Sequence, residues 1–156
     1  MKAIIVYATL TGNTEQIVEL LAMNLRALQV DVTVEKSDID AYTTFQAKDF
    51  TNYDICVVGA YTYGNEGQFP DELGDIYDDL EKTDLSGKIY TCIGSGEEVY
   101  GYFCQAVEDF DKQFQKTNAK RGADLVKIEA DPKTDEDRKT IQRCAEQLVE
   151  AVKNQS

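Results

Sequence analysis

A hydroxyl-rich loop follows the first apolar run of the chain and has the composition of an anion site. Its sequence is Thr9-Leu10-Thr11-Gly12-Asn13-Thr14, and a segment with helical periodicity begins directly after it. A helix N-terminus presents unpaired N–H groups, so hydroxyls and a glycine at that point can cradle an anion without a cationic side chain. One Thr or Asn alone would indicate a helix cap. Four such groups within six residues favour a phosphate instead.

The kind of phosphate is limited by motifs that the sequence lacks. There is no GxxxxGK(S/T) segment, which would bring a lysine to the β and γ phosphates of a nucleotide. There is also no GxGxxG segment, the signature of a pyrophosphate-binding turn. The loop therefore fits a single phosphate group.

Two further loops carry tyrosines next to glycines. Their sequences are AYTYGNEGQFP at 60–70 and GSGEEVYGYF at 94–103. Exposed tyrosines on two such loops can sandwich a flat ring, while backbone N–H and C=O groups bind its polar edge. For either loop alone, tyrosines that half-cover the edge of a core are the structural alternative. Two tyrosine loops beside a phosphate loop favour the ring site.

Five short apolar runs, rich in Val, Ile and Tyr, predict β-strands. They cover residues 3–8, 30–35, 54–60, 88–94 and 124–130. The first, third and fourth runs are nearly continuous, as in parallel strands buried on both faces, whereas 30–35 alternates as an edge strand does. We therefore expect the second strand at an edge of a parallel sheet.

Between these runs, apolar residues recur every three or four positions and predict four helices with their core faces. The stripes are Ile17, Leu21, Leu25 and Leu28; Leu73, Ile76, Tyr77 and Leu80; Phe103, Val107, Phe110 and Phe114; and Ile141, Cys144, Leu148 and Val152. The polar segment 38–53, anchored by Phe45 and Phe50, predicts a weak helix or a loop. The chain, 1–156, is expected to form one domain of alternating strands and helices with right-handed crossovers. In such sheets ligands bind beyond the carboxyl ends of the strands, where the three loops lie.

The charge balance excludes several functions. The 156 residues carry 29 acidic and 16 basic side chains, a net charge of −13, which argues against nucleic-acid or anionic-membrane binding and favours a basic protein partner. The chain has no histidine, which excludes histidine-based catalysis, and its four cysteines lack metal-ligand spacing. We expect buried, reduced thiols and no metal site. Without a signal sequence or an apolar run near the length of a membrane span, a cytoplasmic location is expected.

These features together resemble the flavodoxin family, and specifically its short-chain members. The first loop is close to the family's T-x-T-G-x-T phosphate signature, and GSGEEVYGYFCQAV is similar to the family's second flavin loop, G-x-G-D-x-x-Y-x-x-F-C. The last strand continues through Asp131-Pro132 without the loop that interrupts it in long-chain members. The resemblance covers almost the whole chain. It implies an α/β fold, a three-layer α/β/α sandwich around a five-stranded parallel sheet of order 2-1-3-4-5.

The resemblance also implies the cofactor, FMN, and the residues that bind it. The implied phosphate site is Thr9, Leu10, Thr11, Gly12, Asn13 and Thr14, where Leu10 contributes its backbone N–H. Tyr63 and Tyr100 are expected against the two faces of the ring, and Glu97 takes the place of the usual Asp at its pyrimidine edge. The full set implied for the ring is Ala60, Tyr61, Thr62, Tyr63, Gly64, Asn65, Ser95, Gly96, Glu97, Tyr100, Tyr102 and Phe103.

The implied function is electron transfer and not enzymatic catalysis. A family member carries single electrons at low potential, with non-covalently bound FMN alternating between a neutral semiquinone and an anionic hydroquinone. Tyrosine faces and acids such as Glu66 and Glu97 disfavour the anionic form, because burial and negative charge both oppose charge on the ring. The Gly64 carbonyl is expected to accept a hydrogen bond from the semiquinone, since glycine tolerates both peptide orientations. The implied partners are basic-surfaced flavodoxin or ferredoxin reductases and acceptor enzymes, with the protein acting as a monomer.

Three alternatives remain open. A flavin-dependent NAD(P)H or quinone reductase of the same broad fold needs a second nucleotide or substrate site, for which the sequence shows no basic cluster or glycine motif. A receiver-type signalling domain needs a phosphoacceptor Asp at the end of the third strand, where this chain has Gly59-Ala60-Tyr61. An interaction module without a cofactor would be colourless, whereas a protein with bound FMN is yellow.

Overall fold

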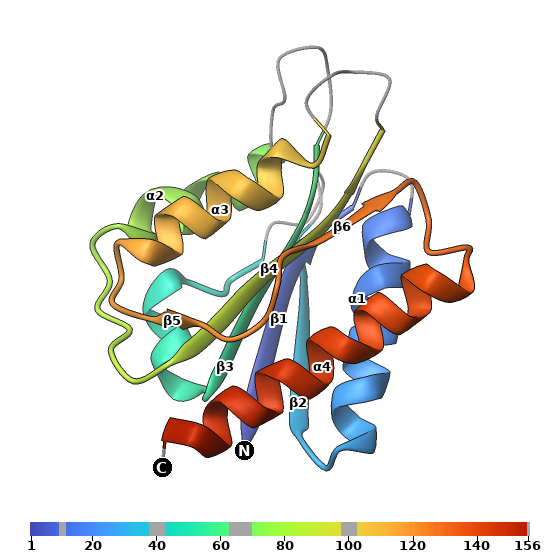
Figure 1. The fold of residues 1–156 in the computed structure, drawn as a ribbon. Coiled ribbons are helices and arrows are strands. Elements are labelled where there is room, and N and C mark those ends of the chain that lie inside the picture. The colour runs from blue at the N-terminus through green and yellow to red at the C-terminus, as the bar shows by residue number, and fades with distance from the viewer. Residues whose placement is uncertain (10–11, 38–42, 63–69, 98–102, 156) are drawn as a thin grey trace.

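A parallel β-sheet lies in the centre of the molecule, between two layers of helices (Figure 1). The computed structural model describes residues 1–9, 12–37, 43–62, 70–97 and 103–155. The strands are β1 (Lys2–Ala8), β2 (Asp31–Ser37), β3 (Ile55–Tyr61), β4 (Ile89–Gly96), β5 (Lys120–Arg121) and β6 (Val126–Glu129). Their order is β2-β1-β3-β4-β5, β6 also pairs with β4, and every pairing is parallel. The predicted strand order and the three-layer α/β/α architecture are confirmed.

Helices cover both faces of the sheet (Figure 1). On one face lie α1 (Asn13–Ala27) and α4 (Asp135–Gln155), and on the other lie α2 (Gly74–Leu80) and α3 (Gln105–Gln115) with the short 3₁₀ helices η1 (Ala47–Asn52) and η2 (Asp71–Leu73). The predicted anchor Phe50 of η1 is buried and packs edge to face on Phe45, with ring centroids 4.9 Å apart. None of the helices in the described ranges is long and apolar enough to cross a bilayer.

The burial of the strands follows their sequence pattern. Every residue of β4 is buried, and β1 is buried from Ala3 to Ala8, as expected for central strands. β2 buries only Val32 and Ser37 and lies at the edge of the sheet, as predicted. Each fully buried Ile or Val of the central strands stabilises the fold by roughly 1.5–3 kcal/mol. The sheet is therefore a rigid support for the loops at its carboxyl edge.

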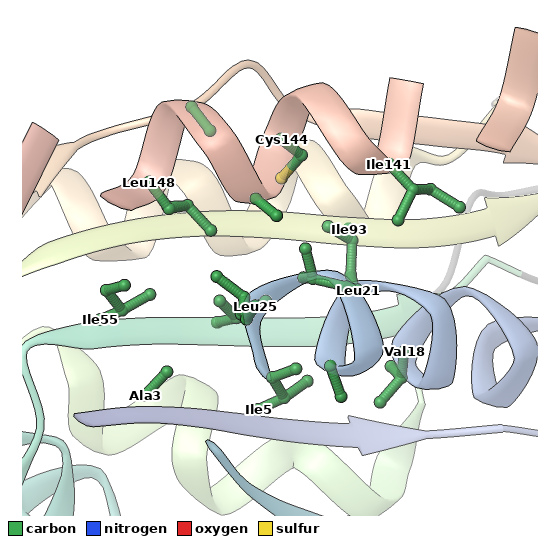
Figure 2. Close-up of a cluster of buried hydrophobic side chains, with 14 of the residues drawn as sticks. Ala3, Ile5, Val18, Leu21, Leu25, Ile55, Ile93, Ile141, Cys144 and Leu148 are labelled. Carbon is green, nitrogen blue, oxygen red and sulfur yellow. The ribbon is translucent and has the colours of Figure 1, made fainter. Parts of the chain in front are cut away.

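One core lies between the sheet and the pair α1 and α4 (Figure 2). Leu21 and Leu25 of α1 face Leu148 of α4 across this core, and all three are fully buried. The α1 stripe ends earlier than predicted, since Leu28 lies just beyond the helix and is 43% exposed. The chain leaves the helix there through Gln29, which has a left-handed φ of 67°.

The second core lies between the sheet and the layer of α2, α3 and η1. It is aromatic: Phe50 and Phe114 are fully buried, and Tyr90 of β4 stacks on Phe114 with ring centroids 4.6 Å apart. On this face, two residues of the predicted helical stripes lie outside the α-helices. Leu73 belongs to η2, and Phe103 precedes the start of α3.

The fifth position of the sheet holds two short strands where the sequence predicted one. Ile89 pairs with Lys120 of β5, whereas Ile93 pairs with Val126 of β6. Four steps along β4 thus correspond to six steps along the edge, so the edge contains two extra residues. Such a bulge interrupts the backbone ladder between the two strands.

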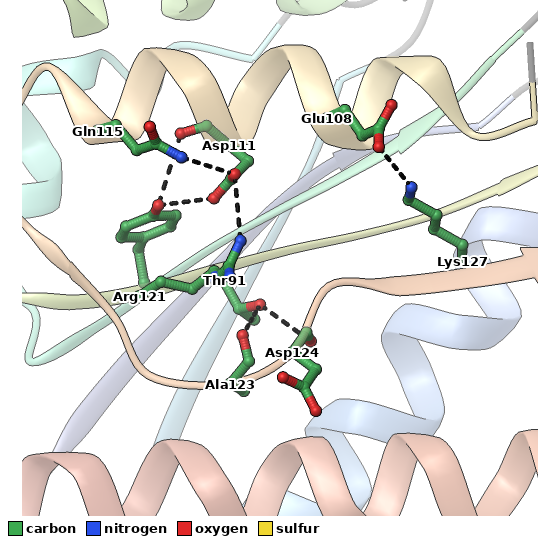
Figure 3. A network of polar contacts seen from close by, with 9 residues as sticks. Thr91, Glu108, Asp111, Gln115, Arg121, Ala123, Asp124 and Lys127 are labelled. Atoms are coloured by element: carbon green, nitrogen blue, oxygen red, sulfur yellow. Dashed lines mark hydrogen bonds and ion pairs between the residues drawn. The ribbon is translucent and has the colours of Figure 1, made fainter.

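Side chains replace the interrupted ladder and tie both edge strands to α3 (Figure 3). The Thr91 hydroxyl donates to a backbone carbonyl between the strands at 3.1 Å. Arg121 Nη1 of β5 lies 3.2 Å from Asp111 Oδ2 of α3, and Lys127 Nζ of β6 lies 2.8 Å from Glu108 Oε1. The edge strands and α3 therefore support one another.

Candidate functional site

The first loop, 9–14, turns directly into α1. Gly12 has a left-handed φ of 89°, where a side chain would be strained, and its N–H donates to Thr9 Oγ1 at 2.9 Å. The first intrahelical bond runs from the Gln16 N–H to the Gly12 carbonyl at 3.1 Å. The N–H groups of residues 13–15 therefore precede the helical ladder and point toward the loop. The N-cap residue is Gly12, and among the described residues no side chain caps this end of α1.

Thr14 and Ser95 join the first loop to the third loop, 94–103. Thr14 is fully buried, Ser95 is 4% exposed, and their hydroxyl oxygens lie 2.8 Å apart. α1 approaches the sheet closely at this point because Gly59 of β3 has no side chain. A Cβ at Gly59 would lie 3.0 Å from Val18 Cγ2 and 3.4 Å from Thr14 Cγ2. The start of α1 is therefore held against the ends of β3 and β4.

Thr62 holds the start of the second loop, 60–70, against the third. Its N–H donates to the Ser95 carbonyl at 3.1 Å, and its hydroxyl accepts from the Ala106 N–H at 2.8 Å. The Thr62 hydroxyl thus satisfies one of the otherwise free N–H groups in the first turn of α3. Three predicted site residues, Thr14, Ser95 and Thr62, are thereby brought into one hydrogen-bonded group.

The ends of β3 and β4 pack too closely for side chains. A Cβ at Gly94 would lie 2.0 Å from the Ala60 carbonyl oxygen, and a Cβ at Gly96 would lie 2.9 Å from the Cys104 backbone nitrogen. Cys104 itself precedes α3 with a left-handed φ of 53°. The second and third loops therefore leave the sheet from closely spaced positions.

Other predicted site residues surround this group with varied exposure. Asn13, Tyr61 and Phe103 are half-buried, and Glu97 is exposed. The Tyr61 phenol donates to Glu72 Oε2 at 3.2 Å. Seven predicted residues lie outside the described residues: Leu10, Thr11, Tyr63, Gly64, Asn65, Tyr100 and Tyr102.

A polar cluster beside the first loop was not predicted from the sequence. The Tyr7 phenol donates to Glu15 Oε1 at 2.5 Å, and Lys36 Nζ lies 3.4 Å from the same oxygen. Burial raises the pKa of Tyr7, and the Glu15 carboxylate adds to this effect. The hydrogen bond from Tyr7, aided by Lys36, lowers the pKa of Glu15. Tyr7 and Lys36 are paired across β1 and β2, so only the strand register could have revealed the cluster.

The cysteines are buried free thiols, as predicted: Cys56, Cys92, Cys104 and Cys144. Burial raises the pKa of Cys56, of Cys104 and of Cys144 to about 12. These thiols remain protonated at neutral pH and belong to the cores.

A surface groove of about 710 Å³ lies between the edge strand and α4. Its lining mixes cations such as Lys120 and Arg143 with anions such as Glu146 and Glu150. β5 pairs with the start of β4, whereas the loops leave from the end of β4 at Gly96. The groove is therefore separate from the loop site.

Comparisons with known proteins agree with this geometry. Residues 5–143 match the family profile described as Flavodoxin. Probable flavodoxin 2 of Bacillus subtilis (strain 168) is 37% identical over 145 residues, which cover 90% of this chain and 89% of that protein. The flavodoxin of Streptococcus pneumonia TIGR4 is 43% identical with a TM-score of 0.88, over 96% of this chain and 99% of that one. A short-chain flavodoxin associated with a non-canonical PDU bacterial microcompartment is 41% identical with a TM-score of 0.90, over 97% of this chain and 99% of that one.

These matches extend over nearly the whole chain and include its strand order and all three loops. The reductase alternative is not favoured by them, since the three relatives named above, covered over 89% or more of their length, are flavodoxins. The chain belongs to the flavodoxin family, the FMN-binding electron carriers.

Proposed function

We propose that the three loops at the carboxyl ends of β1, β3 and β4 bind the FMN of this electron carrier, with the phosphate at the N-terminus of α1. The donors there fit a phosphate dianion, because N–H groups and hydroxyls bind it without bringing a cation to the ring. Thr9 Oγ1 already accepts from the Gly12 N–H, so its own proton is free to donate. This hydrogen bond between Gly12 and Thr9, at the start of α1, is the observation that carries the proposal.

The isoalloxazine ring is assigned to the second and third loops. FMN supplies one-electron redox chemistry when it is bound, and the residues of the chain orient it and exclude water. Thr62 supports this assignment, because its bonds to Ser95 and Ala106 hold the two loops at a constant spacing. The proposed ring residues are Ala60, Tyr61, Thr62, Tyr63, Gly64, Asn65, Ser95, Gly96, Glu97, Tyr100, Tyr102 and Phe103.

The charge of the protein favours a low reduction potential. Glu97 is exposed at the base of the third loop, and the chain carries a net charge of −13. Negative charge near the ring opposes further negative charge on it, so the more reduced form is disfavoured. Glu97→Gln should therefore raise the lower of the two one-electron potentials.

The proposed partners are basic-surfaced reductases and acceptor enzymes. The protein is proposed to bind them as a single-domain monomer. Six exposed acids lie on or beside η2 and α2, which follow the second loop in the sequence: Asp71, Asp75, Asp78, Asp79, Glu81 and Asp84. Opposite charge on a partner would speed the encounter, and salt screens such attraction. Electron delivery by a basic reductase should slow as ionic strength rises from 20 to about 300 mM. A rate indifferent to salt would count against this assignment of partners.

An anaerobic reductive titration of the FMN-loaded protein, followed by absorbance, tests the function. Two separate one-electron steps are expected. The affinity for FMN should exceed that for riboflavin by roughly a hundredfold, about 2.7 kcal/mol, because only FMN carries the phosphate. Equal affinities would contradict a phosphate at α1, and rapid NADPH oxidation by the pure protein would restore the reductase alternative.

A further inference from the structure

A buried pair of hydroxyls connects two elements that are distant in the sequence. Thr14 Oγ1 and Ser95 Oγ lie 2.8 Å apart, Thr14 is fully buried, and Ser95 is 4% exposed. Neither side chain is used by the helical or strand ladders, since both ladders consist of backbone groups. Among the residues that the structure describes, the two buried hydroxyls share this one bond, in which either oxygen can be the donor.

Ser95 is held by the sheet, whereas Thr14 lies in the first turn of α1, close to the proposed phosphate. The Ser95 backbone pairs with Tyr61 in the sheet, and its carbonyl accepts from the Thr62 N–H at 3.1 Å. Thr14 is the second residue of α1, among the N–H groups that precede the helical ladder. The immobile partner is thus the strand residue, and the partner near the proposed phosphate is the helix residue.

The direction of the shared hydrogen bond depends on what lies at the helix N-terminus. A hydroxyl has one proton and two lone pairs, so Thr14 can donate to a phosphate oxygen while it accepts from Ser95. An anion at the helix N-terminus favours this orientation, and donors in a chain strengthen one another. Without Ser95, the lone pairs of Thr14 would be buried without a donor and its proton would have no preferred direction.

We propose that Ser95 is a positioning residue for the phosphate site: its hydroxyl donates to Thr14, and this bond directs the Thr14 proton toward the FMN phosphate. The inference rests on the proposed phosphate site and adds a residue from β4 to it. Ser95 acts through Thr14, so its side chain should affect the phosphate, while only its backbone contributes to the ring site.

The ratio of the riboflavin Kd to the FMN Kd measures the phosphate contribution alone and tests this inference. Both constants are measured by quenching of flavin fluorescence on the wild-type apoprotein and on Ser95→Ala, Thr14→Val and the double variant. Ser95→Ala should lower the ratio about threefold to tenfold, the effect of one hydrogen bond. Thr14→Val should lower it at least as much. The double variant should match Thr14→Val, because Ser95 has no effect without the Thr14 hydroxyl.

Three results would overturn the inference. A ratio unchanged in Ser95→Ala would show that Thr14 needs no partner. Equal weakening of riboflavin and FMN would place the effect on the ring or on the fold. If the fold reduction of the ratio in the double variant equals the product of the two single-variant reductions, the two hydroxyls act separately.

A further variant and the wild-type ratio separate folding and site failures. Ser95→Cys keeps a weak donor of similar size, so its ratio should lie between those of the wild type and Ser95→Ala, even if the alanine variant folds poorly. A wild-type ratio of one would overturn the phosphate site itself, and this inference with it. A wild-type preference that Ser95→Ala retains would overturn only the role of Ser95.

Discussion

The Tyr7 phenol donates a 2.5 Å hydrogen bond to Glu15 Oε1, and Lys36 Nζ lies 3.4 Å from the same oxygen. The three side chains come from β1, α1 and β2, so this contact pins three elements at the point where the first loop begins. Tyr7 is 4% exposed, so little water can replace its bond. The contact also directs the Glu15 carboxylate toward Tyr7 and Lys36.

Tyr7→Phe should destabilise the apoprotein at pH 7 by about 1.5–2 kcal/mol, because it removes a hydrogen bond to a charged group. The folded Glu15 pKa is lowered, so this contribution is present above the ordinary carboxyl pKa and is lost as the pH falls through the folded one. Urea unfolding of both proteins at pH 7 and near pH 3 measures the difference. Tyr53→Phe is the control, since within the described residues the Tyr53 phenol has no hydrogen bond. A difference that persists undiminished at low pH would contradict this account.

Gly94→Ala should destabilise the protein by at least about 3 kcal/mol or prevent folding, because the added Cβ would lie 2.0 Å from the Ala60 carbonyl oxygen. Gly74→Ala provides a matched control: it has a helical φ of −60°, and a Cβ there meets nothing within 4 Å. The control should be neutral or more stable by about 0.4–1 kcal/mol. Thermal unfolding of the two apoproteins decides the matter, and similar melting temperatures would refute the steric argument.

Asp111→Ala should cost about 2–4 kcal/mol. Asp111 is 6% exposed, and its carboxylate accepts from the Tyr90 phenol at 2.6 Å and pairs with Arg121 at 3.2 Å (Figure 3). Its removal leaves the buried Tyr90 hydroxyl without this acceptor. Glu81→Ala breaks the Lys116 ion pair, whose members are about half exposed, and should cost under about 0.5 kcal/mol. Denaturant unfolding compares the two, and equal losses would show that burial does not matter here.

The thiols should resist modification in the folded state. A pKa of about 12 in place of the ordinary 9 lowers the thiolate fraction of Cys56 at pH 8 by roughly a thousandfold. A thiol-reactive disulfide reagent should therefore label native protein very slowly and urea-unfolded protein rapidly. Because the folded pKa is raised, the associated stability is present below pH 9 and is lost as the pH rises toward 12. Rapid labelling of any thiol at pH 8 under native conditions would contradict its burial.

Much of the sheet was predictable because its signals are local. Continuous apolar runs separate the buried strands β1, β3 and β4 from the edge strand β2. The Lys120–Arg121 strand was missed because two cationic residues carry no apolar pattern, and its position depends only on pairing with β4. Leu28 followed the helical spacing, but the left-handed Gln29 ends the helix first.

The site was predictable residue by residue but not in its connections. The first loop could be recognised from Thr9, Gly12 and Thr14, because the conformational freedom of a glycine and the hydrogen-bonding groups of a threonine are properties of the single residue. The contact between Thr14 and Ser95 spans 81 positions in the sequence and depends on the close approach at Gly59. A single-domain extent and a cytoplasmic location stay predictions.

The bulge between β5 and β6 has a consequence for behaviour at high concentration. An exposed strand edge with a regular row of N–H and C=O groups is a template on which another chain can add a strand and begin to aggregate. Here the edge offers a two-residue strand, a four-residue connection and then a four-residue strand out of register with the first. A straight strand cannot match both segments at once. At this edge the irregularity therefore disfavours the addition of a strand from another chain.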